Sequence, residues 1–318
     1  MGRQLNYVIP ESYNGRKVIH YLRGEAGLSS RLTISLKYRP DGILLNGEHI
    51  RTIDPLKTGD ILTVNLPDES GTVSAVPVVQ LDIVYEDADV LIINKPVGML
   101  SQKAKPEDIS ANEYIIAYLL QSGALKEEAL NTFKPSICNR LDRNTSGLLI
   151  AGKTLKGLQE MSEALKERDA KRGVQKYYRC IVSGVLKEKT YLKGYLSKDE
   201  RTNKVTVYKT KPEDKTIECL PIETEYRPIA SVNGFTELEV HLITGRSHQI
   251  RAHLASIGHP IIGDTKYGLA KINERFGKEC RLKSQLLHAY RIRFTDGREV
   301  IAPTPKQYDK VWEYIQEA

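Results

Sequence analysis

Cysteine is scarce in this chain, and its spacing excludes two common kinds of stabilised small domain. Only four cysteines occur in 318 residues, and no two of them form a CxxC pair. Neither a zinc site nor a disulfide framework is therefore indicated. The four lie far apart in the sequence, at Cys138, Cys180, Cys219 and Cys280.

Long apolar runs are also missing. No stretch reaches the length of about 20 residues that a membrane-spanning helix needs, and no signal peptide opens the chain. The simplest location is a reducing cytosol, so we expect a cytoplasmic protein without a membrane partner.

The motifs of several large enzyme classes are absent as well. The sequence has no Walker A loop, no GxGxxG after a strand and no HExxH. His248 and His253 are five residues apart, which on a helix turns them about 140° from each other. They do not share a face, so metal ligation by this pair is not indicated.

What the sequence does have is a sizeable apolar fraction and an excess of positive charge. Apolar residues make up 40% of the chain, which is enough for a core. The 47 basic and 40 acidic side chains give a net charge of +7. Between Lys166 and Lys215 there are 15 basic and 7 acidic residues. Such a stretch is either a solvated face or a surface for a polyanion such as RNA.

The first 70 residues predict a small α+β unit. The apolar pattern from Val18 to Leu22 indicates a short helix, and Ser29 or Ser30 can cap a second one. The pair Asn46-Gly47 predicts a hairpin, and "TGDILTVNLP" a further strand. This order resembles an S4 RNA-binding module. Its nine basic and eight acidic residues nearly cancel, which leaves its RNA binding open.

A change of composition separates this unit from the rest of the chain. The stretch "PDESGTVSAVPVV", residues 67–79, combines proline, glycine, serine and acids, as linkers do. We therefore predict an S4-like RNA-binding domain over residues 1–70, a linker over 71–80 and a larger domain over 81–318.

The larger domain mixes strands and helices without strict alternation. We predict an α+β fold with a mixed, largely antiparallel central sheet flanked by helices. Its strand-like runs are Val90–Ile93, Tyr177–Val182, Val205–Val207, Thr236–Leu242 and Leu287–Phe294. Its helix-like runs are Ala111–Leu120, Leu155–Lys166 and His248–Ile257.

Four stretches of this domain carry residues suited to chemistry. They are "YEDADVLIINKPVGM", "NRLDRNTSGLLI", "QKYYRCIVSG" and "LITGRSHQIRAHLASIGHPIIGD". In this order and spacing they resemble the RluA-type RNA pseudouridine synthases, over roughly residues 81–294. The near-intact motifs "RLDRNTSGL" and "TGRSHQIRAH" make the resemblance specific.

The resemblance implies an isomerase with the pseudouridine synthase fold. The reaction breaks the C1′–N1 bond of a uridine, rotates the uracil and rejoins it through C5. It involves no redox change and no external group, so we expect neither a cofactor nor a metal. It needs a carboxylate near the sugar, as a nucleophile or as a base. The family assigns that role to the aspartate of "RLD", here Asp142.

The resemblance also assigns companions to Asp142. Arg251, from "HQIR", would be the cation that favours the ionised carboxylate. Arg140 would fill the gap left by the flipped base. Tyr178 would stack on the uracil and help to remove the C5 proton, and Ile250 would wall the pocket. Plain surface or core roles are the alternatives for these four residues.

Two further positions bear on the mechanism. Tyr177 is the alternative to Tyr178, because neighbours on a strand face opposite ways. Asn139 stands where the family often has histidine, so a histidine base is not available there.

Three functions are compatible with these residues. The first is an RNA pseudouridine synthase, with large-subunit (23S-type) ribosomal RNA as the expected target, because of the S4-like module and the basic stretch; transfer RNA is the alternative target. The second is an inactive RNA-binding protein of the same fold. The third is a hydrolase that uses Asp142 with a second carboxylate, for which Asp264 is the candidate. We expect a monomer.

Overall fold

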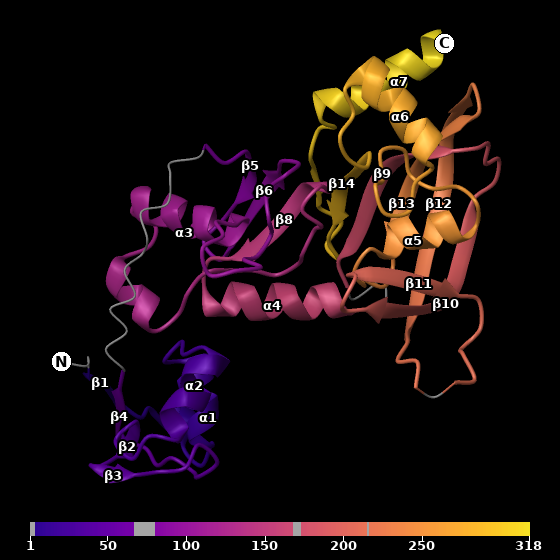
Figure 1. Ribbon diagram of the computed structural model, residues 1–318. Coiled ribbons are helices and arrows are strands. Elements are labelled where there is room, and N and C mark those ends of the chain that lie inside the picture. The colour runs from indigo at the N-terminus through magenta and orange to yellow at the C-terminus, as the bar shows by residue number, and fades with distance from the viewer. Residues whose placement is uncertain (1–3, 67–79, 168–172, 215) are drawn as a thin grey trace.

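The computed structural model describes residues 4–66, 80–167, 173–214 and 216–318. Its strands form two separate sheets, one of four strands and one of eleven. Figure 1 shows the four-stranded sheet and its helices as a small body beneath α3 and α4 of the larger part. Residues 71–79 of the predicted linker lie outside the described residues, so the domain boundaries stay predictions.

The N-terminal sheet confirms the predicted helices and hairpin. Ser29 caps the second helix, where its Oγ accepts a hydrogen bond from the Leu32 N–H at 3.2 Å. Asn46 and Gly47 both adopt positive φ, as a tight hairpin turn requires. The elements are β1 (Gln4–Val8), a 3-10 helix (Glu11–Tyr13), α1 (Val18–Gly24), α2 (Ser30–Lys37), β2 (Ile43–Leu45), β3 (Glu48–His49) and β4 (Ile61–Asn65), in the sheet order β1-β4-β2-β3.

The eleven-stranded sheet is mixed and largely antiparallel, as predicted. Its main path runs β11-β10-β12-β13-β9-β14-β8-β6-β5, and β14 with β8 is its parallel pair. The strands are β5 (Ile83–Glu86), β6 (Val90–Lys95), β7 (Ser136–Ile137), β8 (Ser146–Gly152), β9 (Gln175–Ser183), β10 (Thr190–Asp199), β11 (Lys204–Tyr208), β12 (Leu220–Val232), β13 (Phe235–Leu242), β14 (Leu287–Arg293) and β15 (Glu299–Ile301).

Helices cover both faces of this sheet. All seven residues of β8 are buried, because one face meets α3 and the other meets α4. In β9, Cys180 packs toward α5 while Ile181 packs toward α6 and α7. The helices are α3 (Ala111–Gln121), α4 (Leu155–Lys166), α5 (Gln249–Ser256), α6 (Ala270–Cys280) and α7 (Lys306–Glu317), with a 3-10 turn at Glu127–Asn131.

A close backbone contact fixes the parallel pair. Gly147 has φ +111°, and a Cβ at this position would lie 2.2 Å from the Ala289 carbonyl oxygen. No side chain fits there, so glycine is required where β8 meets β14. This contact lies five residues after the aspartate of "RLD" and anchors the chain that leaves it.

Candidate active site

Asp142 lies in a turn between β7 and β8, four residues before β8 begins, rather than on the strand itself. The turn closes on its own backbone, since the Thr145 N–H donates to the Asp142 carbonyl at 3.0 Å. Ser101 holds the residue before it. The Ser101 Oγ accepts from the Leu141 N–H at 3.0 Å and donates to the Leu141 carbonyl at 2.8 Å.

A buried lysine stabilises the same turn through hydrogen bonds. Lys95 ends β6 and is fully buried. Its Nζ donates to the carbonyl oxygens of Pro96, Met99 and Arg143, at 3.0, 2.9 and 3.1 Å. Burial lowers the pKa of Lys95 to about 8, while the charge of Asp142 acts in the opposite direction. Sequence reasoning assigned this lysine no role, although a lysine that ends an apolar strand was a usable signal.

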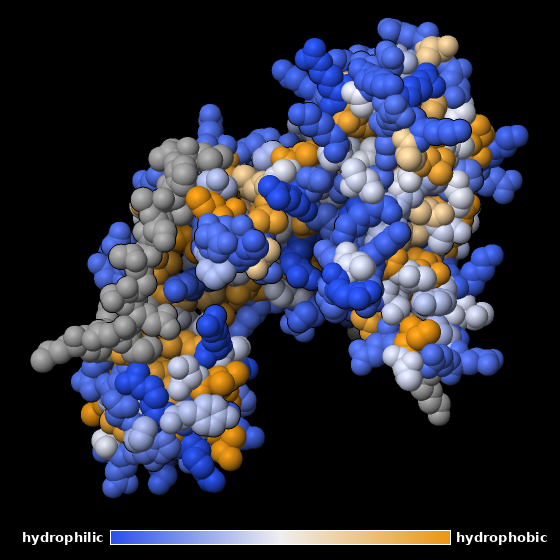
Figure 2. Space-filling view, in the orientation of Figure 1, coloured by the Kyte–Doolittle hydropathy of each residue, from blue (hydrophilic) through white to orange (hydrophobic). Residues whose placement is uncertain are grey.

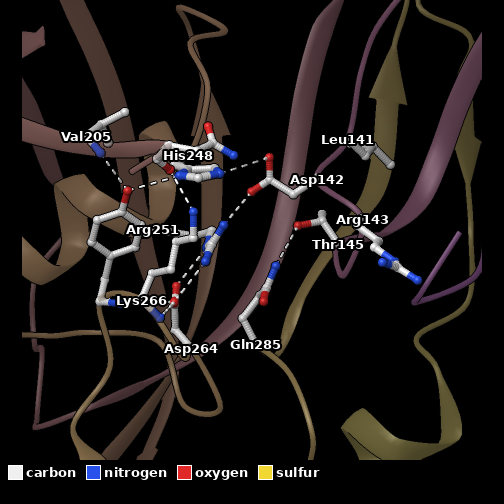
Figure 3. A network of polar contacts seen from close by, with 12 residues as sticks. Leu141, Asp142, Arg143, Thr145, Val205, His248, Arg251, Asp264, Lys266 and Gln285 are labelled. Carbon is white, nitrogen blue, oxygen red and sulfur yellow. Dashed lines mark hydrogen bonds and ion pairs between the residues drawn. The ribbon is translucent and has the colours of Figure 1, made fainter. Parts of the chain in front are cut away.

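Arg251, on α5, lies between two carboxylates. Its Nη1 donates to Asp142 Oδ2 at 2.8 Å. Its Nε and Nη2 donate to the two oxygens of Asp264, at 2.7 and 2.9 Å. Burial alone lowers the pKa of Arg251, but the hydrogen bonds and charge of Asp264, together with Asp142, raise it further than burial lowers it. The guanidinium is therefore a fixed cation that holds one oxygen of the Asp142 carboxylate (Figure 3).

Asp264 supports Arg251 and does not face the cavity. Only 1% of it is exposed, and one of its oxygens also accepts the N–H groups of Lys266 and Tyr267. Burial raises the pKa of Asp264, but the hydrogen bond and charge of Arg251 outweigh burial and lower it. Both oxygens are occupied by Arg251, so Asp264 does not act as the second carboxylate of a hydrolase. Its part as the anchor of Arg251 was not predicted.

A cavity of about 1090 Å³ opens above Asp142. Asp142 is the only acidic residue among the described residues that line it, and nine are basic. Figure 2 shows hydrophilic side chains on both sides of a hollow in this part of the molecule. Because nine basic side chains and one acidic side chain line the cavity, its electrostatic potential favours a polyanion. The nine are Lys103, Arg140, Arg143, Lys166, Lys176, Lys198, Arg246, Arg251 and Lys266.

The two adjacent tyrosines of β9 lie on opposite faces of the sheet, as strand alternation predicts. Tyr178 lines the cavity and is buried, whereas Tyr177 stacks on His241 with ring centroids 4.7 Å apart. Burial, and to a lesser degree the charge of Asp142, raises the pKa of the Tyr178 hydroxyl. Tyr178 therefore keeps its proton near neutral pH and presents a neutral ring to the cavity.

The remaining predicted residues also lie at the cavity. Arg140 is exposed at its rim, and no polar contact of its side chain is found within the described part of the chain. Ile250 lines the cavity and also belongs to the core beneath it, so both of its expected roles hold together. Asn139 binds the β8 backbone, where its Oδ1 accepts from the Ile150 N–H at 2.8 Å. This is a structural role.

His248 and Tyr267 complete the surroundings of Asp142. His248 precedes α5 in a left-handed conformation with φ 55°, and its Nε2 lies 4.0 Å from Asp142 Oδ1. Its Nδ1 lies 3.0 Å from the Tyr267 hydroxyl. His253 instead contacts Thr224 at 3.0 Å, in agreement with the prediction that the two histidines do not share a face. Neither His248 nor Tyr267 was predicted to belong to the site.

Within the described ranges, no three His, Cys, Asp or Glu side chains are grouped so as to hold a metal ion. No helix of the described chain is long and apolar enough to cross a membrane.

Comparison with known proteins identifies the class. The family model for RNA pseudouridylate synthase matches residues 89–256, a stretch that contains Asp142, Tyr178 and Arg251. The chain belongs to this family, in its RluA branch. It is an RNA pseudouridine synthase, an isomerase that acts on RNA.

Individual relatives cover nearly the whole chain. An uncharacterized RNA pseudouridine synthase of Bacillus subtilis is 30% identical over 297 residues, which cover 91% of this chain and 95% of the relative. A ribosomal large subunit pseudouridine synthase D of Xanthomonas campestris is 28% identical and covers 98% and 92%. The solved structure of human RNA pseudouridylate synthase domain containing 4 matches with a TM-score of 0.59 at 18% identity, over 73% of this chain and 92% of that one. That match supports the pseudouridine synthase fold.

Proposed function

We propose that Asp142 is the catalytic carboxylate and that the target is large-subunit ribosomal RNA. The catalytic role of Asp142 is supported by its position, since it is the single acid among the described residues that line a basic cavity. Its Oδ2 is held by Arg251, and its side chain is still 26% exposed toward the cavity. A carboxylate that is both paired and accessible suits either a nucleophile or a base at the sugar.

The residues around Asp142 divide the remaining work. Arg251 keeps the carboxylate charged and oriented. Tyr178 stacks on the flipped uracil as a neutral ring rather than as the base expected to help remove the C5 proton, and Ile250 forms the wall beside it. Arg140 enters the space that the base leaves, for which an exposed, unpaired guanidinium at the rim is well placed. We assign no step to a cofactor.

The charges of the cavity favour RNA as the bound polyanion. Lys166, Lys176 and Lys198 come from the basic stretch identified in the sequence, and all three line the cavity. Lysine and arginine contacts to phosphates release counterions, so binding should weaken steeply with salt. We propose that the enzyme acts as a monomer.

Ribosomal RNA of the large subunit is the proposed target, with transfer RNA as the alternative. Relatives named ribosomal large subunit pseudouridine synthase D and C match more than nine tenths of the chain at 28% identity. We expect pseudouridine mapping of total RNA, with and without the gene, to show a site lost from large-subunit RNA. Restoring the gene should restore the site. A loss confined to transfer RNA would overturn the assignment.

The N-terminal unit is proposed to serve target selection rather than chemistry. It has its own buried core around Leu22, Leu36 and Leu62, and none of its residues from 4 to 66 lines the cavity. Deletion of residues 1–75 should therefore leave a folded, active enzyme on short RNA that has lost affinity or selectivity on natural RNA. Melting curves and kcat/KM on both substrates measure this. Full activity of the deletion variant on natural RNA at physiological salt would contradict the role.

A further inference from the structure

The two oxygens of the Asp142 carboxylate have different surroundings. Oδ2 accepts the Arg251 hydrogen bond at 2.8 Å. Oδ1 makes no hydrogen bond within the described chain, and His248 Nε2 lies 4.0 Å from it. Figure 3 shows Arg251 and His248 approaching the carboxylate from the same side. One oxygen is thus held, and the other is faced by a ring nitrogen that does not yet bond to it.

We propose that His248 is a positioning residue that orients Oδ1 of Asp142 with its Nε2–H when RNA is bound. The inference rests on the proposed role of Asp142 and adds a second hold to that of Arg251. With both oxygens held, the plane of the carboxylate is fixed relative to the sugar. A single hydrogen bond from Arg251 leaves the carboxylate free to rotate about its Cβ–Cγ bond.

The contact with the Tyr267 hydroxyl is compatible with the required tautomer. The hydroxyl accepts the Val205 N–H of β11 at 2.9 Å, so its own proton is free to donate to His248 Nδ1, 3.0 Å away. A neutral imidazole carries one proton, and an accepting Nδ1 places that proton on Nε2. The proton on Nε2 is then directed at Asp142. Tyr267 also lies against Arg251, whose guanidinium carbon is 5.3 Å from the ring centroid.

Burial, more than the surrounding charges, favours the neutral form of the His248 ring at pH 7. Burial lowers its pKa, Asp142 acts in the opposite direction, and Arg251 and Lys266 lower the pKa further while Asp264 raises it. A neutral ring can donate from Nε2 without forming an ion pair with Asp142. The carboxylate therefore keeps the full charge that either proposed role requires.

The backbone of His248 has a left-handed conformation. Its φ of 55° lies in a region that few residues other than glycine adopt, although histidine is among those enriched there. This conformation turns the chain from the loop after β13 into α5 and directs the imidazole toward Asp142. The present separation of 4.0 Å is longer than a hydrogen bond, and catalytic hydrogen bonds commonly tighten only in the substrate complex.

Two substitutions separate the two ring nitrogens. In His248→Gln, the amide nitrogen stands near the position of Nε2, so the donor toward Asp142 is kept. In His248→Asn, the amide stands near Nδ1, so the contact with Tyr267 is kept and the donor toward Asp142 is lost, while asparagine tolerates the left-handed backbone. We expect His248→Asn to lower kcat at least about tenfold at nearly unchanged KM, and His248→Gln to retain most of kcat.

The assay measures tritium release from total RNA labelled at uridine C5 and prepared from cells that lack the gene. His20→Asn, an exposed histidine on α1, is the control and should match the wild type in kcat. Melting curves and circular dichroism identify a variant that is merely unfolded. Wild-type kcat in His248→Asn would overturn the inference, and so would equal losses in both variants, since a structural histidine would not distinguish them. Activity in Asp142→Asn would instead overturn the proposed function beneath it.

Discussion

Asp142→Asn abolishes pseudouridine formation, by our expectation, while the fold and RNA binding stay nearly intact. Asparagine keeps the size of the side chain and still accepts the Arg251 hydrogen bond through its carbonyl oxygen. It removes the negative charge, on which a nucleophile and a base both depend. The loss should lie entirely in kcat, since the remaining lining residues that bind RNA are untouched. Tritium release under single-turnover conditions measures it.

A matched substitution controls for the change of aspartate to asparagine as such. Asp82 is exposed, and its carboxylate accepts a hydrogen bond from the Asn94 amide at 3.0 Å, which an asparagine can also accept. Asp82→Asn should therefore behave as the wild type in melting, RNA binding and turnover. Pseudouridine formation at the wild-type rate in Asp142→Asn would remove the catalytic assignment. Loss of RNA binding together with activity would assign Asp142 to binding instead.

Elements with a strong local signal could be predicted from the sequence. The helix Leu155–Lys166 begins and ends where predicted, because the Thr154 hydroxyl caps it by accepting the Gly157 N–H at 3.0 Å. The helix at His248–Ile257 is one residue shorter at each end. His248 has a left-handed conformation that hydrophobic periodicity does not reveal.

Other elements are held mainly by tertiary contacts and were not predicted. Strands β10 and β12 carry many polar residues on one face, so an apolar run does not mark them. Helices α6 and α7 pack against β9 and against each other, through Phe276, Val311 and Ile181 among others. Their apolar positions indicate a buried face only once the sheet that they cover is known.

The residues of the site also include some that could be predicted from the sequence and some that could not. Residues inside near-intact motifs, such as Asp142 and Arg251, could be placed at the site from the sequence. The contacts of the supports, Lys95, Asp264 and Tyr267, could not be predicted, because no spacing rule says which segment each of them meets. Lys95 binds the carbonyl of Arg143 from β6, and Asp264 binds Arg251 from the loop after α5. Their function depends on the packing that brings these segments together.

Arg251→Met should cost both activity and stability, with the larger part of the stability loss arising at Asp264. Methionine fills a similar volume but leaves the buried Asp264 carboxylate without its two guanidinium hydrogen bonds. Removal of one partner of a buried ion pair typically costs about 3–5 kcal/mol. Activity should fall severely as well, because Asp142 loses its fixed cation. Chemical denaturation and single-turnover assays measure the two losses separately.

Arg227→Met is the matched control for this change. Arg227 pairs with Glu239 at 2.9 Å, but more than half of its side chain is exposed. Glu239 is only 13% exposed but stays paired with Arg291 at 2.9 Å, so loss of the exposed Arg227 should cost about 0–1 kcal/mol, and the control should melt and react nearly as the wild type. If Arg251→Met were equally mild in both assays, Arg251 would not be the partner that holds the two carboxylates.

The pH dependence identifies Asp264 as the source of the stability loss. In the wild type, Arg251 lowers the pKa of Asp264 below its ordinary value, so this group stabilises the fold above the unfolded pKa of about 3.9 and loses that contribution as the pH falls through the lowered value. In Arg251→Met, burial acts without the guanidinium and raises the pKa instead, so the charged form destabilises the fold at neutral pH. Protonation relieves this penalty in acid. The difference in unfolding free energy between wild type and variant should therefore be largest near pH 7. It should shrink as the pH falls through the raised pKa of the variant and shrink further below about pH 4, whereas a loss from packing alone would be independent of pH.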